Sequence, residues 1–226
     1  MTAENIHGQH IRLARRGAYR FGLVASACLG MVGLAAGAAQ AFAVGGVVTT
    51  STHALANPGH PYVFQDTFEV HQLGAVLAGG AHNQAEAESI QCSAARPCRS
   101  VSLSFQVVTM VGAPAHLNAV NLSSSENVRC PGCQSLAVAY QFVVSTESAF
   151  ALSPATLQEL GNLHNQLNAL RASNAPATQL KADVDALAGQ VTSILKAAVA
   201  AAPKGAHAGT SSTAPQVTVH RMVGQH

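Results

Sequence analysis

One short unit occurs twice in this chain, as Cys98-Arg-Ser-Val-Ser-Leu-Ser-Phe-Gln-Val-Val108 and as Cys133-Gln-Ser-Leu-Ala-Val-Ala-Tyr-Gln-Phe-Val143. The copies match column by column: Ser100 with Ser135, Phe105 with Tyr140, Gln106 with Gln141, and Val108 with Val143. Upstream, Asn83 precedes Cys92 by nine positions, and Asn121 precedes Cys130 by nine. The shared spacing predicts a duplicated structural element.

Both copies show the period-2 pattern of a half-buried β-strand. Apolar residues at every second position are Val101, Leu103, Phe105 and Val107 in the first copy, and Leu136, Val138, Tyr140 and Phe142 in the second. A weaker run of strand length precedes each cysteine pair, and turn-forming Pro131 and Gly132 lie between the second pair. We therefore expect two cysteine-tipped β-hairpins, 83–108 and 121–146, in a small antiparallel sheet. Residues 62–70 add a further strand.

The pattern changes to a helical period after the second unit. Ser153 and Pro154 are an N-cap followed by proline at the first helical position. Two leucine-rich stripes then recur at three- and four-residue steps, separated by a break at 173–176. They predict an antiparallel helical hairpin over 153–200, which packs on the sheet or serves for self-association. The predicted fold class is α+β.

The N-terminal region has the composition of an export signal. Four arginines within residues 1–20 precede an uncharged run over 21–48, and Ala41-Phe42-Ala43 fits a cleavage site. We expect residues 1–43 to be a cleaved signal peptide; a retained membrane anchor is the alternative, because the run exceeds about 20 residues. A linker over 44–61, the α+β domain over 62–200 and a disordered tail over 201–226 follow.

The charge balance argues against nucleic-acid binding. The whole chain is formally +2. Without residues 1–43 the Lys and Arg total is 12 − 4 = 8 and the Asp and Glu total is 10 − 1 = 9, so the exported part is about −1. Such a chain lacks the basic field that a phosphate backbone requires. We expect a protein partner in the envelope and contact with the membrane only through the N-terminal segment.

Four of the five cysteines, Cys92, Cys98, Cys130 and Cys133, lie beyond the export signal. In an oxidising compartment an even number of cysteines favours disulfides, and we expect the local pairs Cys92–Cys98 and Cys130–Cys133. Four cysteines allow three connectivities, so the pairing is open. The alternative is a structural zinc site made by the same four residues, although C-x5-C departs from the usual first knuckle. We otherwise expect no cofactor.

Residues suited to catalysis do not form a known motif. The eleven histidines are scattered, and none forms the H-E-x-x-H motif of zinc proteases; His164-Asn-Gln-Leu-Asn168 shares only its spacing. Glu86 and Glu88 lie on one face of a strand, as expected of a solvated sheet surface. Nucleophile-elbow, phosphate-loop and dinucleotide motifs are absent from the sequence. We therefore expect a protein that is not an enzyme.

The order of motifs in this chain resembles that of a group of uncharacterised exported bacterial proteins. The motifs are a cysteine pair followed by Ser-[Val/Leu]-x-[Leu/Val]-x-[Phe/Tyr]-Gln-x-Val, which occurs twice, and then Leu-Ser-Pro before a leucine-striped helical hairpin. The resemblance covers about 83–199. Some members are labelled as peptide zinc metalloprotease proteins, and they usually carry C-x2-C in both copies. The resemblance supplies no catalytic residue. Together with the residues above, it predicts an exported, non-catalytic structural or binding protein of the cell envelope. The alternative is a zinc-binding accessory module of a peptide-processing system.

Overall fold

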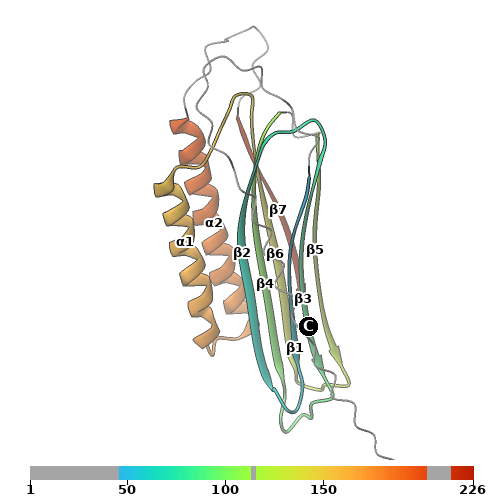
Figure 1. Ribbon diagram of the computed structural model, residues 1–226. Helices are drawn as coiled ribbons and strands as arrows, with labels where there is room; N and C mark the ends of the chain where they lie inside the picture. The colour runs from blue at the N-terminus through green and yellow to red at the C-terminus, as the bar shows by residue number, and fades with distance from the viewer. Residues whose placement is uncertain (1–45, 113–115, 203–214) are drawn as a thin grey trace, which may run out of the picture. The chain divides into compact units, whose positions relative to one another are not determined.

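The computed structural model describes residues 46–112, 116–202 and 215–226. The elements follow in the order β1 (Val47–Ala56), β2 (Tyr62–Ala75), β3 (Gly79–Ile90), β4 (Arg99–Val111), β5 (Leu117–Val128), β6 (Gln134–Thr146), α1 (Pro154–Ala169), a 3-10 turn η2 (Leu170–Ala172), α2 (Ala177–Ala201) and β7 (Gln216–Gln225). Figure 1 shows long strands stacked in two layers, with the two helices on one side.

Successive strands alternate between two sheets, so the expected small antiparallel sheet of hairpins is wrong. One sheet has the order β1-β3-β5, and its strands are all parallel; the other has the order β2-β4-β6-β7, with only β7 antiparallel. The two strands of each expected hairpin do lie next to each other, but face to face in different sheets. Period-2 patterning locates a strand, yet it does not specify which strand becomes its hydrogen-bonded partner.

The strands that do pair are equivalent strands of the two sequence copies. In β4 and β6, Ser100 is opposite Ser135 and Gln106 is opposite Gln141, in the columns that the sequence aligns. Asn83 of β3 is likewise opposite Asn121 of β5. Parallel pairing therefore stacks like residues on like residues, as in a solenoid, where each repeat contacts its neighbours.

The space between the two sheets, called the inner layer below, is filled by small and polar side chains. The two sheets are offset sideways by about half of the spacing between neighbouring strands. The Asn83 side-chain amide of β3 donates to the carbonyl of Ser104 in β4 at 3.3 Å and to that of Tyr140 in β6 at 2.9 Å. Asn121 of β5 similarly donates to the carbonyls of Ala139 in β6 and His220 in β7, at 2.9 Å each. Each strand of the three-stranded sheet thus lies over the gap between two strands of the other.

The opposite face of the four-stranded sheet, called the outer face below, packs on the helices. Aromatic rings contact one another from strand to strand: Phe68 stacks on Phe105 at 5.6 Å between ring centroids, and Phe105 meets Tyr140 in a tilted arrangement at 5.2 Å. The helices contribute the other half of this core through Leu160, Leu163, Leu167, Leu180, Val184, Leu187, Val191 and Leu195, all buried. The leucine stripes that we considered for self-association therefore contact the sheet.

Local sequence explains where α1 begins. Ser153 caps it, since its side chain accepts a hydrogen bond from the Thr156 amide at 3.1 Å, and Pro154 occupies the first turn. By length and composition α2 could cross a membrane, and within the described ranges it is the one helix of this kind. Its apolar stripe is part of the core, and a single helix of this kind is weak evidence of a membrane span.

The segments expected to lack structure contain two of the strands. β1 occupies most of the predicted linker 44–61, and β7 occupies the end of the predicted disordered tail 201–226. β7 pairs with β6 over ten residues, from Leu136 opposite Gln225 to Ser145 opposite Gln216. The predicted signal peptide or anchor, 1–43, lies outside the described residues.

Candidate functional site

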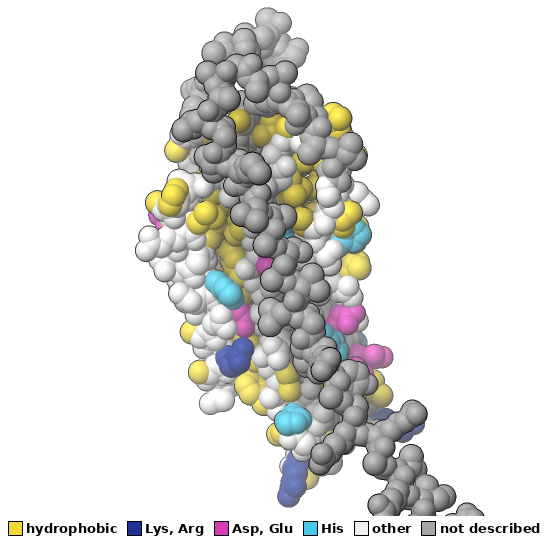
Figure 2. Space-filling view, in the orientation of Figure 1, with side chains coloured by type: hydrophobic (Ala, Val, Ile, Leu, Met, Phe, Trp, Pro, Cys, Tyr) yellow, Lys and Arg dark blue, Asp and Glu magenta, His cyan; other side chains and the backbone are white. Residues whose placement is uncertain are grey.

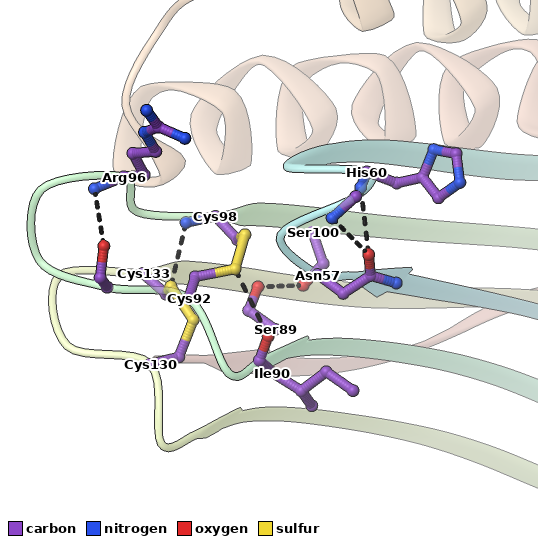
Figure 3. The surroundings of a disulfide bond; sticks show 12 residues. Asn57, His60, Ser89, Ile90, Cys92, Arg96, Cys98, Ser100, Cys130 and Cys133 are labelled. Carbon is purple, nitrogen blue, oxygen red and sulfur yellow. Dashed lines mark hydrogen bonds between the residues drawn. A yellow bond between two sulfur atoms is a disulfide. The ribbon is translucent and has the colours of Figure 1, made fainter.

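The four cysteines come together at one end of the sandwich (Figure 3). Cys92 and Cys98 lie in the β3–β4 connection and form a disulfide; Cys130 and Cys133 lie in the β5–β6 connection and form a second. All four sulfur atoms lie within 4.8 Å of one another, and all four residues are buried. The structure therefore supports the expected disulfide bonds, and it stacks them one on the other.

Backbone geometry at the two connections explains this placement. Gln91 and Arg129 hold equivalent positions after β3 and β5, and both adopt a positive φ, of 57° and 49°. This left-handed conformation turns the chain sharply toward the other sheet. In the shorter connection Gly132 also has a positive φ, of 77°, which glycine adopts without steric cost. The β3–β5 register aligns Ile90 with Val128, so the turns begin at the same level and Cys92 lies at the level of Cys130.

Backbone and side-chain hydrogen bonds hold the two disulfides against each other. The Cys98 amide donates to the sulfur of Cys133 at 3.0 Å, and the Gln134 amide donates to the Cys98 carbonyl at 3.0 Å. The Asn127 amide group donates to the Cys133 carbonyl, also at 3.0 Å. An N–H group directed at sulfur also stabilises a thiolate, because it places a positive partial charge beside the anion.

A buried serine network lies next to the cysteines in the inner layer. The hydroxyl oxygens of Ser89, Ser100 and Ser135 lie 2.8 to 3.1 Å apart, and the Ser135 hydroxyl is also 2.7 Å from the Asn127 side-chain oxygen. A serine nucleophile needs a base within hydrogen-bond reach. Each of these three hydroxyls is fully buried and hydrogen-bonded to other hydroxyls, so the network has a structural role.

The other residues considered from sequence do not converge. Glu86 and Glu88 lie on the solvent-facing side of β3, and the Glu86 carboxylate accepts a hydrogen bond from the Gln84 side chain at 2.5 Å. His53 of β1 is the register partner of Glu86. On the side of the molecule seen in Figure 2, charged side chains are few and scattered among apolar and uncharged polar ones. Glu86 and Glu88 therefore occupy a solvated sheet surface.

Asp66 of β2 is a buried carboxylate that the sequence patterns do not single out. Its side chain is 2% exposed and lies 3.2 Å from Nε2 of His164 and 3.6 Å from the guanidinium of Arg171. The ring of His164 also stacks on Phe68, at 5.8 Å between ring centroids. This cluster attaches α1 and the turn after it to β2. The available signal was an aspartate on the core-facing side of an aromatic strand.

A second polar cluster joins α2 and β7 to the outer face. The Tyr140 hydroxyl donates to Asp185 at 2.6 Å, and Arg221 of β7 donates to the same carboxylate at 2.7 Å. Burial and the hydrogen bond to Asp185 raise the pKa of Tyr140. Burial alone would raise the pKa of Asp185, but hydrogen bonds from Tyr140, Arg221 and Lys181 outweigh it and hold that pKa below the usual value. Tyr140 therefore stays neutral and Asp185 ionised, as a structural clamp requires.

Among these clusters, only the four cysteines combine close approach, burial and a chemistry that changes with the surroundings. As disulfides they are covalent cross-links; as thiolates they are a ligand set for a tetrahedral metal ion such as zinc. Comparison with models of protein families, with curated proteins and with solved structures finds no match for this chain.

Proposed function

We propose that this chain is an exported, non-catalytic structural or binding protein of the cell envelope. The observation that carries the proposal is the pair of stacked disulfides at the end of the sandwich. Disulfides persist in extracytoplasmic compartments and are rare where thiols are kept reduced. The basic and then apolar N-terminal composition supplies the route of export.

The distribution of polar groups supports a structural role. The buried side-chain amides of Asn83, Gln106 and Gln141 donate their hydrogen bonds to groups within the sandwich. Catalytic groups, in contrast, are placed where a substrate can reach them. The rigid sheets act as a scaffold, and binding uses their exposed surfaces and edges.

The test is an intact mass of the chain recovered from the cell envelope or medium, with alkylation before and after reduction. The expected mass begins near Val44, and no thiol reacts until the disulfides are reduced. A chain that stays in the cytoplasm, or that carries four free thiols at isolation, would overturn the proposal. If the chain is recovered from a membrane fraction with a mass that includes residues 1–43, the export proposal stands, and the N-terminal segment is a retained anchor instead of a cleaved signal peptide.

A second candidate function is a zinc-binding accessory module of a peptide-processing system. It is favoured by the approach of all four cysteine sulfurs within 4.8 Å and by the amide of Cys98 that donates to the Cys133 sulfur. If four thiols become reactive only after chelation and a native mass spectrum shows about 65 Da of additional mass, this candidate replaces the first. The matched control is the Cys92→Ser/Cys98→Ser variant, which removes two of the four ligands.

A further inference from the structure

β1 and β2 are edge strands on the same lateral side of the sandwich, and within the part of the chain that the structure describes they form an unoccupied ledge. β1 lies over the gap between β2 and β4, since the Thr50 hydroxyl donates to Glu69 of β2 at 2.7 Å and accepts from Gln106 of β4 at 3.1 Å. At this lateral edge β2 therefore projects beyond β1 by about half of the spacing between neighbouring strands. Its inner-layer residues Thr67, Glu69 and His71 are only partly buried, beside the free edge of β1.

Among the described residues, nothing pairs with the outer edge of β1. Because the Gly80 amide donates to the Gly46 carbonyl, the even-numbered residues of β1 direct their backbone groups at β3. The backbone groups of the odd-numbered residues, among them Thr49, Ser51 and His53, consequently point to the open edge. β1 contains no Asp, Glu, Lys, Arg, Gly or Pro. Edge strands of natural sheets usually carry such residues to prevent pairing with another chain.

Of the two carboxylates of β2, only Glu69 faces the ledge, and a register shift between Gln72 and Ala75 limits further pairing to the part of β2 before it. The Asp66 side chain is buried against His164 and Arg171 on the outer face. Glu69 points into the inner layer, where its carboxylate lies 3.1 Å from Nε2 of His71 and accepts the hydrogen bond from Thr50. β1 and β2 therefore both offer unpaired backbone groups to a further strand at this lateral edge.

We propose that the lateral edge formed by β1 and β2 is an interface for a second copy of the chain, related to the first by a two-fold axis parallel to the strands. Such an axis exchanges the two layers, so the partner's β2 lies on the ledge beside β1, and the partner's β1 lies beside β2. The sideways offset of the sheets makes the two ledges complementary, as an isologous interface requires. Since β1 and β2 run in opposite directions, both new pairs are antiparallel. A two-fold axis perpendicular to the sheets would instead leave a gap one strand wide beside β1.

This proposal rests on the proposed export. When the chain is cleaved after Ala43, only Val44, Gly45 and Gly46 precede β1, and three residues are too short to cover a strand of ten. The segment that precedes β1 then leaves this edge to the partner.

The two-fold axis has one electrostatic consequence. It places the two copies of Glu69 at the same height, facing each other across the inner layer, each with its neighbour His71. Like charges at such a distance weaken association. Replacing Glu69 with glutamine removes the repulsion and keeps an acceptor for Thr50, so this variant associates more tightly than the parent.

The experiment begins with the exported protein, whose start is read from its intact mass. Sedimentation velocity over a range of concentrations then gives the dimer dissociation constant, and hydrogen exchange follows the amides of Thr49, Ser51 and His53. We expect a dimer in which these three amides exchange more slowly as concentration rises. Ser51→Pro removes one edge donor without touching the β1–β3 ladder and weakens the dimer about tenfold or more; Ser51→Ala, the matched control, leaves it unchanged.

Each outcome decides the proposal. A monomer whose edge amides exchange rapidly at every concentration overturns it, as does a dimer that Ser51→Pro and Glu69→Gln leave unchanged. Edge amides protected in a monomer mean that another segment of the chain covers β1, which also overturns it. If circular dichroism shows that Ser51→Pro is unfolded, Glu69→Gln alone decides, by the direction of its effect. A chain that is never exported fails the proposed function instead, and the intact mass distinguishes the two failures.

Discussion

The two faces of the β2-β4-β6-β7 sheet are both buried, but they are stabilised by different chemistry. The outer face carries Leu103, Phe105 and Phe142 against the helices, and contacts there depend on volume and apolar area. The inner face carries Ser104, Gln106 and Gln141, and contacts there depend on hydrogen bonds that point in fixed directions. We therefore expect the outer face to tolerate apolar substitutions that keep the side-chain volume. We expect the inner face to tolerate substitutions only when the new side chain keeps the polar group.

The largest effect is expected from a cavity on the outer face. Phe142 is fully buried and contacts the rings of Phe105 and Tyr140, at 6.0 and 5.9 Å between centroids. Phe142→Ala should lower the free energy of unfolding by about 3–5 kcal/mol, because the cavity adds to the lost apolar burial. Urea denaturation measures the loss. A loss below about 1 kcal/mol would mean that the helices do not pack on this face.

A polarity change of similar volume distinguishes the two faces. The Gln141 amide group donates to the carbonyls of Ala81 and Val120 and to the side-chain oxygen of Gln106. Gln141→Leu removes these bonds and leaves the Gln106 side-chain oxygen buried without this donor, at a cost of about 2–4 kcal/mol. The volume-conserving control on the outer face, Leu136→Met, should cost less than about 1.5 kcal/mol. Equal losses in the two variants, measured by urea denaturation, would remove the distinction.

At the end of the inner layer covalent bonds replace hydrogen bonds. Each disulfide closes a short loop, with sequence separations of 6 and 3, so the Cys92→Ser/Cys98→Ser variant should lose about 2 kcal/mol of stability by the loop-entropy account. Thermal unfolding of this variant and of the equivalent Cys130→Ser/Cys133→Ser variant measures the two bonds separately. A much larger loss from either would show that the cysteine end organises the whole inner layer.

The smallest effect is expected at the rim of the outer face, where Tyr140, Asp185 and Arg221 form their cluster. Tyr140→Phe removes one hydrogen bond to a carboxylate that is a third exposed, and should cost about 1–2 kcal/mol. The pKa of Asp185 is depressed in the folded chain, so its contribution is present above its unfolded value of about 4 and is lost as the pH falls below it. Asp185→Asn should flatten the acid limb of a stability–pH curve, and an unchanged limb would contradict this.

The sequence located the strands that carry the repeated unit but not their partners. Ser100 and Ser135 align in the sequence and are opposite each other in the parallel ladder, so the column alignment already contained the register. The fold class was wrong because Ser102 and Ser104 were interpreted as a solvated face. Both are fully buried, since small side chains allow the second sheet to approach closely. Alternation of apolar and small residues does not distinguish water from a neighbouring sheet.

The cysteine site was the most predictable part of the molecule, and the polar clusters the least. Spacing in the chain placed Cys92 near Cys98 and Cys130 near Cys133, and the repeat explains why the two pairs stack. In contrast, Asp66 meets His164, and Tyr140 meets Arg221, over separations that no local pattern encodes. Sequence patterns do not reveal β1, because its Thr- and Ser-containing stretch has the composition of a loop, or β7, because it follows a Gly-, Ser-, Thr- and Ala-rich stretch.

The parallel register has a consequence for the time at which the chain acquires its shape. Arg99 lies 99 − 62 = 37 positions after its partner Tyr62, and Gln134 lies 134 − 99 = 35 after Arg99. No strand can pair with its neighbour in the sheet until a further length of this size has been synthesised, and such distant contacts form slowly. A chain with this topology remains extended for longer than one built from hairpins, and under the export proposed above this delay would keep it competent to pass through a translocation channel before it folds.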